Sequence, residues 1–268
     1  MKMIINFTPT GMIPTKEMNP YVPVTPEEII EEVLSVRFLV TMVHLHARDE
    51  EGIPTYRAEV YEKIIQGIRE VDKDLVLCVS LSGRTFPEFE QRVEPLKTKP
   101  DMGSLTLSSV NFNKQASVNT PNMIQRLAEY MLSEDVVPEL EVFDVGMINY
   151  AKYLIKKGLI QPPYYFNLIV GNVSCAQLDL NHIGNMIKDL PLGSLWSLGG
   201  VGKAQYAANV IGIAMGGGVR VGLEDNIWYD QKRMMQASNR DLILRLHQVA
   251  QEFERDMMTP QEFREMML

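Results

Sequence analysis

Apolar and polar positions along the chain follow two alternating patterns. Short runs rich in β-branched residues predict buried strands, and the longer stretches between them carry apolar residues at helical spacing. Such an alternation is typical of parallel strands joined by crossover helices. Eight runs have the strand pattern: 3–8, 38–47, 75–82, 102–109, 138–144, 164–171, 193–200 and 218–224.

The stretches between these runs carry helix start signals. In the first of them Thr25 is a predicted N-cap, Pro26 takes the first helical position and Glu28 completes a capping box. Eight strand–helix repeats without an inserted linker predict a (β/α)8 TIM barrel, with residues 1–268 as a single catalytic domain. Residues 259–268 add one capped helix, which we expect on the surface. Further helical patterns cover residues 57–71, 120–132, 148–158 and 203–217.

Composition narrows the class of protein. The chain has 268 residues, of which 46% are hydrophobic, so it can bury a large core and is not disordered. Its 34 acidic and 26 basic residues give a net charge of −8, a poor match for nucleic acid or an anionic membrane. Neither a signal peptide nor a membrane-spanning run is predicted, and two cysteines are too few for a disulfide framework. We therefore expect a cytoplasmic protein that acts on small molecules.

Polar and ionisable residues gather at the ends of the predicted strands. In a barrel these ends meet at one mouth, where the loops that follow the strands form the active site. The sequence therefore predicts a polar site built from several strands. The residues at these ends are His44, His46, Arg48, Ser80, Ser82, Arg84, Thr106, Ser108, Glu141, Asp144, Asn167, Glu224 and Asp225.

The segment VHLHAR predicts a metal site. His44 and His46 stand two residues apart on a strand, so both side chains face inward and can meet one divalent metal, typically zinc. Glu224, at the end of the last strand, is a candidate third ligand on the same face as Arg220. The alternatives are two histidines that only form hydrogen bonds inside the barrel, and an N-cap role for the acid at Asp225.

Two further features have more than one interpretation. The turn LGGVGKAQ opens a helix after the seventh strand, so Lys203 and the backbone N–H groups are candidates for binding an anion, although a purely structural turn fits equally well. Glu139 and Glu141 face inward on the fifth strand. A buried acid needs a partner, and for Glu141 the candidates are the metal, Arg220 or a bound substrate.

At VHLHAR, PELEVFD, GGVGKAQ and VRVGLEDN, the sequence resembles the β-keto acid cleavage enzyme family over nearly its whole length. The resemblance implies a (β/α)8 barrel, a homotetramer, and one zinc ion bound by His44, His46 and Glu224. It further implies that a β-keto acid reacts with acetyl-CoA to give acetoacetate and a new acyl-CoA. Asp225, positioned by Arg220, would be the base that removes a proton from the substrate carbon next to the keto group.

The resemblance also places substrate-binding residues. Ser80, Thr106 and Glu141 match pocket residues of the family, and Ser104 is the alternative to Thr106 on the same strand face. Met12 stands where the lysine-fermentation member has a glutamate that binds the substrate's amino group, so an amino substrate is not favoured.

The turn after the third strand departs from the family pattern. It reads SLSGRTF and brings Gly83 and Arg84 to the mouth. Our hypothesis is that Arg84 binds an anionic group, either a distal substrate carboxylate or a CoA phosphate; the alternative is a solvent-facing loop arginine. For the whole protein, two other functions stay open: a zinc-dependent hydrolase or aldolase that does not need CoA, and a non-catalytic metabolite-binding barrel.

Overall fold

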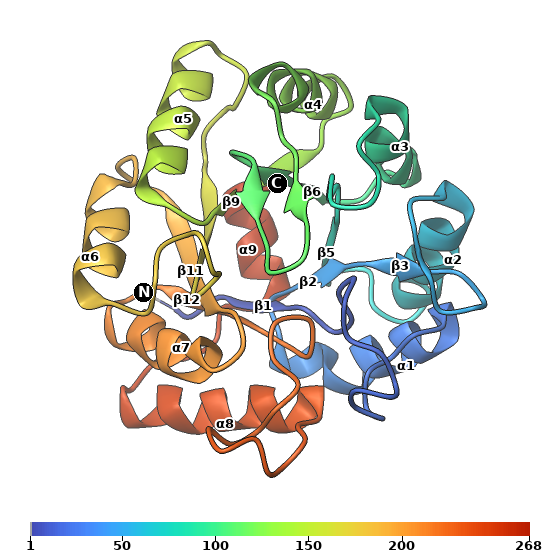
Figure 1. Cartoon of the computed structure of the whole chain (residues 1–268), viewed down its shortest axis with the longest axis vertical. Helices are drawn as coiled ribbons and strands as arrows, with labels where there is room; N and C mark the ends of the chain where they lie inside the picture. Colours follow the sequence, from blue (N-terminus) through green and yellow to red (C-terminus); the bar gives the residue numbers. More distant parts are fainter. Residues whose placement is uncertain (1) are drawn as a thin grey trace.

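The computed structural model describes residues 2–268, and its centre is a closed barrel of parallel strands (Figure 1). Each barrel strand coincides with one of the eight runs predicted from the sequence, β9 beginning one residue earlier at Val137, so the barrel prediction is confirmed. Around the barrel the order is β1, β12, β11, β10, β9, β6, β5 and β2, and β1 closes the ring by pairing with both β12 and β2. The strands are β1 (Ile5–Phe7), β2 (Met42–Leu45), β5 (Val76–Val79), β6 (Met102–Thr106), β9 (Val137–Val142), β10 (Tyr165–Val170), β11 (Leu195–Gly200) and β12 (Gly218–Val221).

Helices surround the barrel and bury one apolar face each against it (Figure 1). The predicted capping box of the first helix is present: the Thr25 hydroxyl accepts from the Glu28 N–H, and the Glu28 carboxylate accepts from the Thr25 N–H. None of the helices within residues 2–268 is long and apolar enough to cross a membrane. The helices are α1 (Pro26–Val36), α2 (Ala58–Arg69), α3 (Phe89–Val93), α4 (Pro121–Ser133), α5 (Val145–Lys156), α6 (Leu180–Asp189), α7 (Ala204–Ala214), α8 (Asn239–Glu252) and α9 (Pro260–Met267), with short 3-10 turns at Arg37–Leu39 and Glu94–Thr98.

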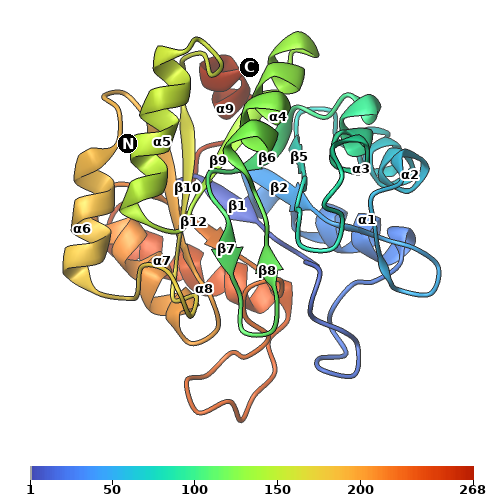
Figure 2. The same ribbon diagram turned by 45° about the horizontal axis from the view of Figure 1, so that its top comes forward.

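The last helix differs from the surface helix expected from its sequence. Helix α9 lies across the end of the barrel where the strands begin, opposite the hairpin of β7 (Val110–Asn111) and β8 (Ala116–Ser117) (Figure 2). Phe263 is fully buried, and its ring lies edge-on to Tyr165 with a centroid distance of 5.6 Å. Since Phe263 and Met267 share one face of the helix, they cap the apolar bottom of the barrel.

The interior of the barrel is layered. Its bottom layer is apolar, with Met42, Val76 and Leu195 against α9. Inward-facing positions alternate along each strand, so the next inward-facing side chain is two residues further on. At these positions the side chains are polar. This second layer contains Asn6, His44, Cys78, Glu139, Asn167 and Ser197, all buried. The layer directly below the mouth of the barrel is therefore polar and not apolar.

Loops build the mouth of the barrel above these layers. Two short antiparallel pairs project from it, β3 (Ala47–Arg48) with β4 (Pro54–Thr55) and β7 (Val110–Asn111) with β8 (Ala116–Ser117). Figure 2 shows the β7–β8 hairpin and the loop before α8 extending from this end.

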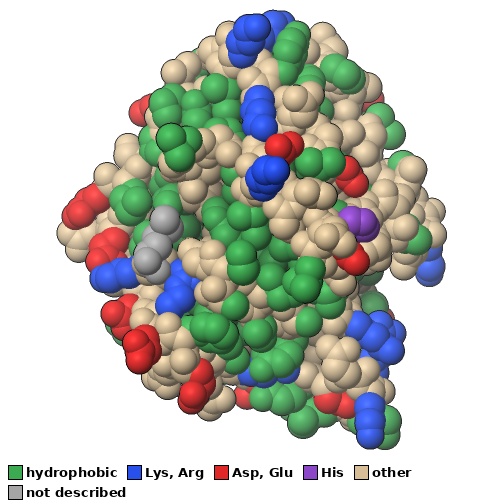
Figure 3. Space-filling view, turned by 90° about the vertical axis from the view of Figure 1, so that its left-hand side faces the viewer, with side chains coloured by type: hydrophobic (Ala, Val, Ile, Leu, Met, Phe, Trp, Pro, Cys, Tyr) green, Lys and Arg blue, Asp and Glu red, His purple; other side chains and the backbone are tan. Residues whose placement is uncertain are grey.

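A different kind of surface lies on the side of the barrel around α6, where hydrophobic side chains are exposed (Figure 3). Leu180 and Leu192, at the two ends of that helix, are 73% and 103% exposed, and Met215 at the end of α7 is 60% exposed.

Candidate active site

A cavity of about 550 Å³ opens at the mouth of the barrel. Its walls come from the ends of the strands, from the loop after β1, from the β7–β8 hairpin and from the loop after β12. The strand ends converge there because the strands are parallel, so residues far apart in sequence share one wall. Ten residues predicted from the sequence line this cavity: Met12, His46, Ser80, Ser82, Arg84, Thr106, Glu141, Arg220, Glu224 and Asp225.

Other predicted residues lie behind or beside the cavity wall. The Ser104 hydroxyl accepts a hydrogen bond from the Leu81 N–H at 3.0 Å, so of the two alternatives on this strand Thr106 faces the cavity. Gly83 is packed against Arg92, whose Nη1 would lie 2.8 Å from a Cβ at that position. Lys203 stands at the start of α7, in a small hollow next to the mouth.

His44, His46 and Glu224 meet at the base of the cavity. The Nε2 atoms of His44 and His46 are 3.3 Å apart, and His46 Nε2 is 3.2 Å from Glu224 Oε1. One ligand atom from each of the three residues lies within 4.8 Å of the others. The second carboxylate oxygen of Glu224, Oε2, is buried and has no hydrogen-bond partner in the described chain. A buried oxygen without a partner indicates a missing ligand, and two imidazoles with one carboxylate are a donor set that suits zinc.

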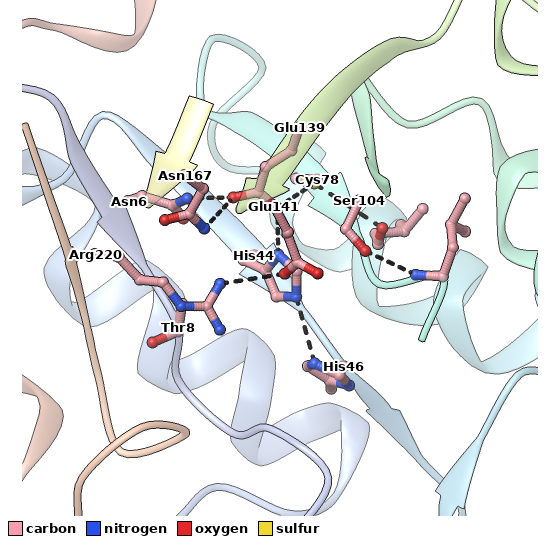
Figure 4. A network of polar contacts seen from close by, with 12 residues as sticks. Asn6, Thr8, His44, His46, Cys78, Ser104, Glu139, Glu141, Asn167 and Arg220 are labelled. Carbon is pink, nitrogen blue, oxygen red and sulfur yellow. Dashed lines mark hydrogen bonds and ion pairs between the residues drawn. The ribbon is translucent and has the colours of Figure 1, made fainter. Parts of the chain in front are cut away.

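Below this trio, Glu139 receives hydrogen bonds in the polar layer (Figure 4). His44 Nδ1 lies 2.6 Å from Glu139 Oε2. Burial alone would lower the pKa of His44, but the negative charge and the hydrogen bond of Glu139 outweigh it and raise the pKa to about 9. For Glu139, burial favours the neutral acid, yet His44 and Arg220 lower its pKa to about 2. Glu139 is therefore the anion that holds His44 in place.

Arg220 organises the carboxylates of the cavity. Its Nη2 lies 2.7 Å from Glu224 Oε1, and its Nε lies 2.8 Å from Asp225 Oδ2. Burial raises the pKa of Asp225 to about 6, because the charge of Glu224 adds to the effect and Arg220 only partly opposes it. The pKa of Glu224 falls, since Arg220, His46 and His44 outweigh its burial. The N-cap alternative for Asp225 is wrong, because the helix that follows is capped by Ser238.

A turn rather than a strand presents Glu224 and Asp225. The sequence predicts continued alternation through Glu224, but β12 ends at Val221 and the Asp225 N–H donates to the Gly222 carbonyl. At Gly222 the chain passes so close to β1 that a Cβ would lie 2.0 Å from the Thr8 carbonyl oxygen. Only glycine fits this approach, and the turn brings both acids to Arg220.

Glu141 has two partners on the opposite side of the cavity. The Thr106 hydroxyl donates to Glu141 Oε2 at 2.7 Å, and Arg220 Nη1 lies 3.7 Å from Glu141 Oε1. Of the three partners considered from the sequence, Arg220 is thus present.

Arg84 is not a free surface arginine. Its guanidinium carbon lies 3.4 Å from the centroid of the Phe112 ring, and its Nε is buried without a hydrogen-bond partner in the described chain. Burial lowers the pKa of Arg84, although it stays a cation. The group therefore presents positive charge to the cavity with hydrogen-bonding capacity to spare.

Several loop residues in the cavity wall were not predicted from the sequence. Phe112 and Lys114 come from the β7–β8 hairpin, and Trp228 and Arg233 come from the loop before α8. The one signal in the sequence was that cationic and aromatic residues stand within polar loops. Irregular segments have no periodicity from which the direction of a side chain can be predicted.

The sequence pattern of the family described as beta-keto acid cleavage enzyme matches residues 2–268. The chain belongs to this family. The resemblance seen in the sequence motifs is thereby confirmed, and with it the prediction of an enzyme that cleaves β-keto acids.

Two relatives and one solved structure are similar to this chain. It is 37% identical over 269 residues to a 3-keto-5-aminohexanoate cleavage enzyme of Fusobacterium nucleatum subsp. nucleatum, covering 99% of this chain and 97% of the relative. It is 30% identical over 260 residues to the 3-oxoadipate:acetyl-CoA acetyltransferase of Cupriavidus necator, covering 96% and 91%. A solved ternary complex of ObcA with a C4-CoA adduct and oxalate shares the fold, with a TM-score of 0.79, 19% identity, and coverage of 92% of this chain and 67% of that one.

Proposed function

We propose that this β-keto acid cleavage enzyme transfers the acyl group of its substrate to coenzyme A, with acetyl-CoA as co-substrate. The β-keto acid would give up its acyl group to form a new acyl-CoA, and the acetyl group would join the remaining two-carbon unit to form acetoacetate. Relatives whose names specify acetyl-CoA support the co-substrate. The observation that carries the proposal is the meeting of Glu224 and Asp225 on one arginine, Arg220, beside the two histidines.

The metal in this proposal is a divalent ion, zinc by preference, bound by His44, His46 and Glu224. The unpartnered Glu224 Oε2 and the close approach of the two imidazoles fit such an ion. When bound, it would supply Lewis-acid polarisation of the substrate's keto and carboxylate oxygens, which makes the carbon between them more acidic.

The protein's own groups would handle the proton and the orientation of the substrate. Asp225 would accept the proton from the carbon between keto group and carboxylate, and its bond to Arg220 Nε fixes the position of the carboxylate. Ser80 would donate a hydrogen bond to a substrate oxygen, whereas the Thr106 hydroxyl, which donates its proton to Glu141, would accept a hydrogen bond from the substrate side. Water is partly excluded because the cavity lies within the barrel mouth.

An assay with and without acetyl-CoA tests this proposal. Metal-loaded protein is incubated with a panel of β-keto acids, and acetoacetate and acyl-CoA are measured. We expect both products in equal amounts, and only when acetyl-CoA is present. Substrate breakdown without acetyl-CoA would favour the hydrolase or aldolase, and no turnover of any substrate would favour the metabolite-binding barrel.

Arg84 is proposed to bind an anionic group of the substrate at the far side of the cavity. Arg84→Ala should lower kcat/KM for β-keto acids with a distal carboxylate by about 10–100-fold, because a charged hydrogen-bonded pair is lost, and leave neutral acids of equal length unchanged. Steady-state kinetics on matched substrate pairs measure this.

The same panel of β-keto acids shows whether Arg84 binds a CoA phosphate instead of a substrate carboxylate. An equal loss for every β-keto acid would assign Arg84 to a CoA phosphate instead, and no loss for any of them would contradict both assignments. Arg57→Ala is the matched control, since Arg57 is an exposed arginine whose side chain is 66% accessible.

Residues around the site also have proposed roles. Met12 would shape the substrate end of the cavity and offers no charge to an amino substrate, whereas Gly83 would act from behind the wall by leaving room for Arg92. Lys203 and Arg233, next to each other in the hollow beside the mouth, would meet CoA phosphates. The exposed apolar side around α6 supports a homo-oligomer, proposed to be a tetramer (Figure 3). Residues 1–268 would act as one catalytic domain in the cytoplasm.

A further inference from the structure

Glu139 is a fully buried carboxylate at the centre of the polar layer, and all its contacts are with hydrogen-bond donors. Its Oε1 accepts from Asn6 Nδ2 at 2.5 Å and from Asn167 Nδ2 at 2.9 Å. Its Oε2 accepts from the Cys78 thiol at 3.2 Å and faces His44 Nδ1 at 2.6 Å. Since an ionised carboxylate can only accept, this set of partners matches its chemistry at both oxygens.

These contacts argue against a second metal site one layer below the first. The donor atoms of His44, Cys78 and Glu139 also lie within 4.8 Å of one another. However, two ligands on a tetrahedral zinc ion are more than about 3 Å apart, given bonds of roughly 2.0–2.3 Å. The 2.6 Å between His44 Nδ1 and Glu139 Oε2 is a charge-assisted hydrogen bond. Glu139 therefore acts on His44 rather than on an ion of its own.

The orientation of the His44 ring follows from this contact. With Nδ1 donating to Glu139, Nδ1 keeps its proton, and Nε2 faces His46 and the cavity as the nitrogen that would lose its proton to bind a metal ion. Asn6 and Asn167 fix the carboxylate from the opposite side, and Asn6 is tied in turn to Tyr165, whose hydroxyl donates to Ser197. Figure 4 shows Asn6 and Asn167 on one side of Glu139 and the two histidines on the other.

We propose that Glu139 is a positioning residue for the metal ligand His44: it holds Nδ1 protonated, directs Nε2 to the ion, and strengthens the imidazole as a donor. This inference rests on the metal site proposed above. Carboxylate partners of metal-bound histidines typically contribute about 10–100-fold to metal affinity. Glu139 does not line the substrate cavity, and its hydrogen bond to the proposed site goes to His44.

Glu139→Gln and Glu139→Ala test the proposal, with Zn²⁺ affinity measured by competition with a chromophoric chelator. We expect the alanine variant to bind Zn²⁺ about 10–100-fold more weakly. The glutamine variant should lose less, roughly threefold to tenfold, because its Oε1 still accepts from Nδ1 while the charge is gone. The amide N–H groups of the new glutamine can donate to the Oδ1 atoms of Asn6 and Asn167, which have no hydrogen-bond partner in the described chain. We therefore expect the glutamine variant to fold more readily than the alanine variant.

NMR of isotope-labelled histidine ring nitrogens gives a second measurement that a purely structural role would not change. The sequence contains only four histidines, so the signals can be assigned by single substitutions. In the Zn²⁺-loaded protein the Nδ1 proton of His44 should resonate far downfield because of the carboxylate. It should move upfield in Glu139→Gln and be lost to exchange in Glu139→Ala.

Glu94→Gln is the matched control, since it makes the same change at a partly buried carboxylate that accepts from the Ala58 N–H at the start of α2, away from His44. It should keep Zn²⁺ affinity within about twofold of wild type. A Glu139→Gln variant within twofold of wild type, or one that loses no more than Glu94→Gln, would overturn the proposal, whether or not the alanine variant folds. A wild-type chain that binds no Zn²⁺ would instead refute the metal site itself, and this inference with it.

Discussion

His46→Ala should abolish both metal binding and turnover. Metal analysis is expected to fall from one divalent ion per chain to well below a tenth, and acetoacetate formation should drop by at least about 10³-fold. The magnitude follows from Lewis-acid stabilisation worth several kcal/mol, of which roughly 4 kcal/mol corresponds to a thousandfold rate. His46 is the best ligand to replace, because its contacts are with His44 and Glu224, whereas His44 is hydrogen-bonded to the buried Glu139.

The control is His182→Ala, which removes an exposed histidine whose ring accepts a hydrogen bond from the Gln177 N–H on the outside of the barrel. It should retain both metal and activity. Urea denaturation of the metal-free proteins shows whether His46→Ala still folds. A folded variant that kept stoichiometric metal and near wild-type turnover would remove His46 from the site.

Asp225→Asn should lower kcat by about 10²–10⁴-fold while the metal stays bound. Asparagine is nearly the same shape, and its carbonyl oxygen can still accept from Arg220 Nε, where Asp225 Oδ2 now lies at 2.8 Å. What it cannot do is take a proton. The loss should therefore appear in kcat, with little change in KM or in the metal content.

Solvent deuterium exchange isolates this step from acyl transfer. With substrate and metal but no acetyl-CoA, wild type should exchange the hydrogens on the carbon between keto group and carboxylate, and Asp225→Asn should not exceed the background rate. Asp179→Asn is the matched control, because Asp179 caps α6 on the surface and asparagine caps equally well. Rapid exchange by Asp225→Asn would assign the base to another group.

The barrel and the inward-facing residues were predictable because strand periodicity alone decides them. Alternation placed His44 and His46 on one face, and the parallel order of strands brought Ser80, Thr106 and Glu141 to the same mouth. These inferences need only the spacing of two residues and the direction of the strands. Local rules of this kind can be applied to the sequence without knowing which distant segments are in contact.

Features that depend on contacts between distant segments could not be predicted. The turn that presents Glu224 and Asp225 exists because Gly222 passes against the Thr8 carbonyl, a contact across the barrel seam. Helix α9 has the pattern of an ordinary surface helix, and only the open bottom of the barrel explains why Phe263 is buried. Arg233 entered the cavity from a loop, where no periodicity aims a side chain.

The position of β1 in the barrel has a consequence for how the site comes into being. The histidines stand on β2 and Glu224 follows β12, and these two strands are neighbours only through β1, which pairs with both. The three proposed ligands thus meet only after the first and last parts of the chain have closed the ring. An ion bound there would select the closed barrel, adding about 2.7 kcal/mol of stability at a hundred times its dissociation constant. Metal supply would then control how much of the newly made chain is closed as well as how fast it turns over.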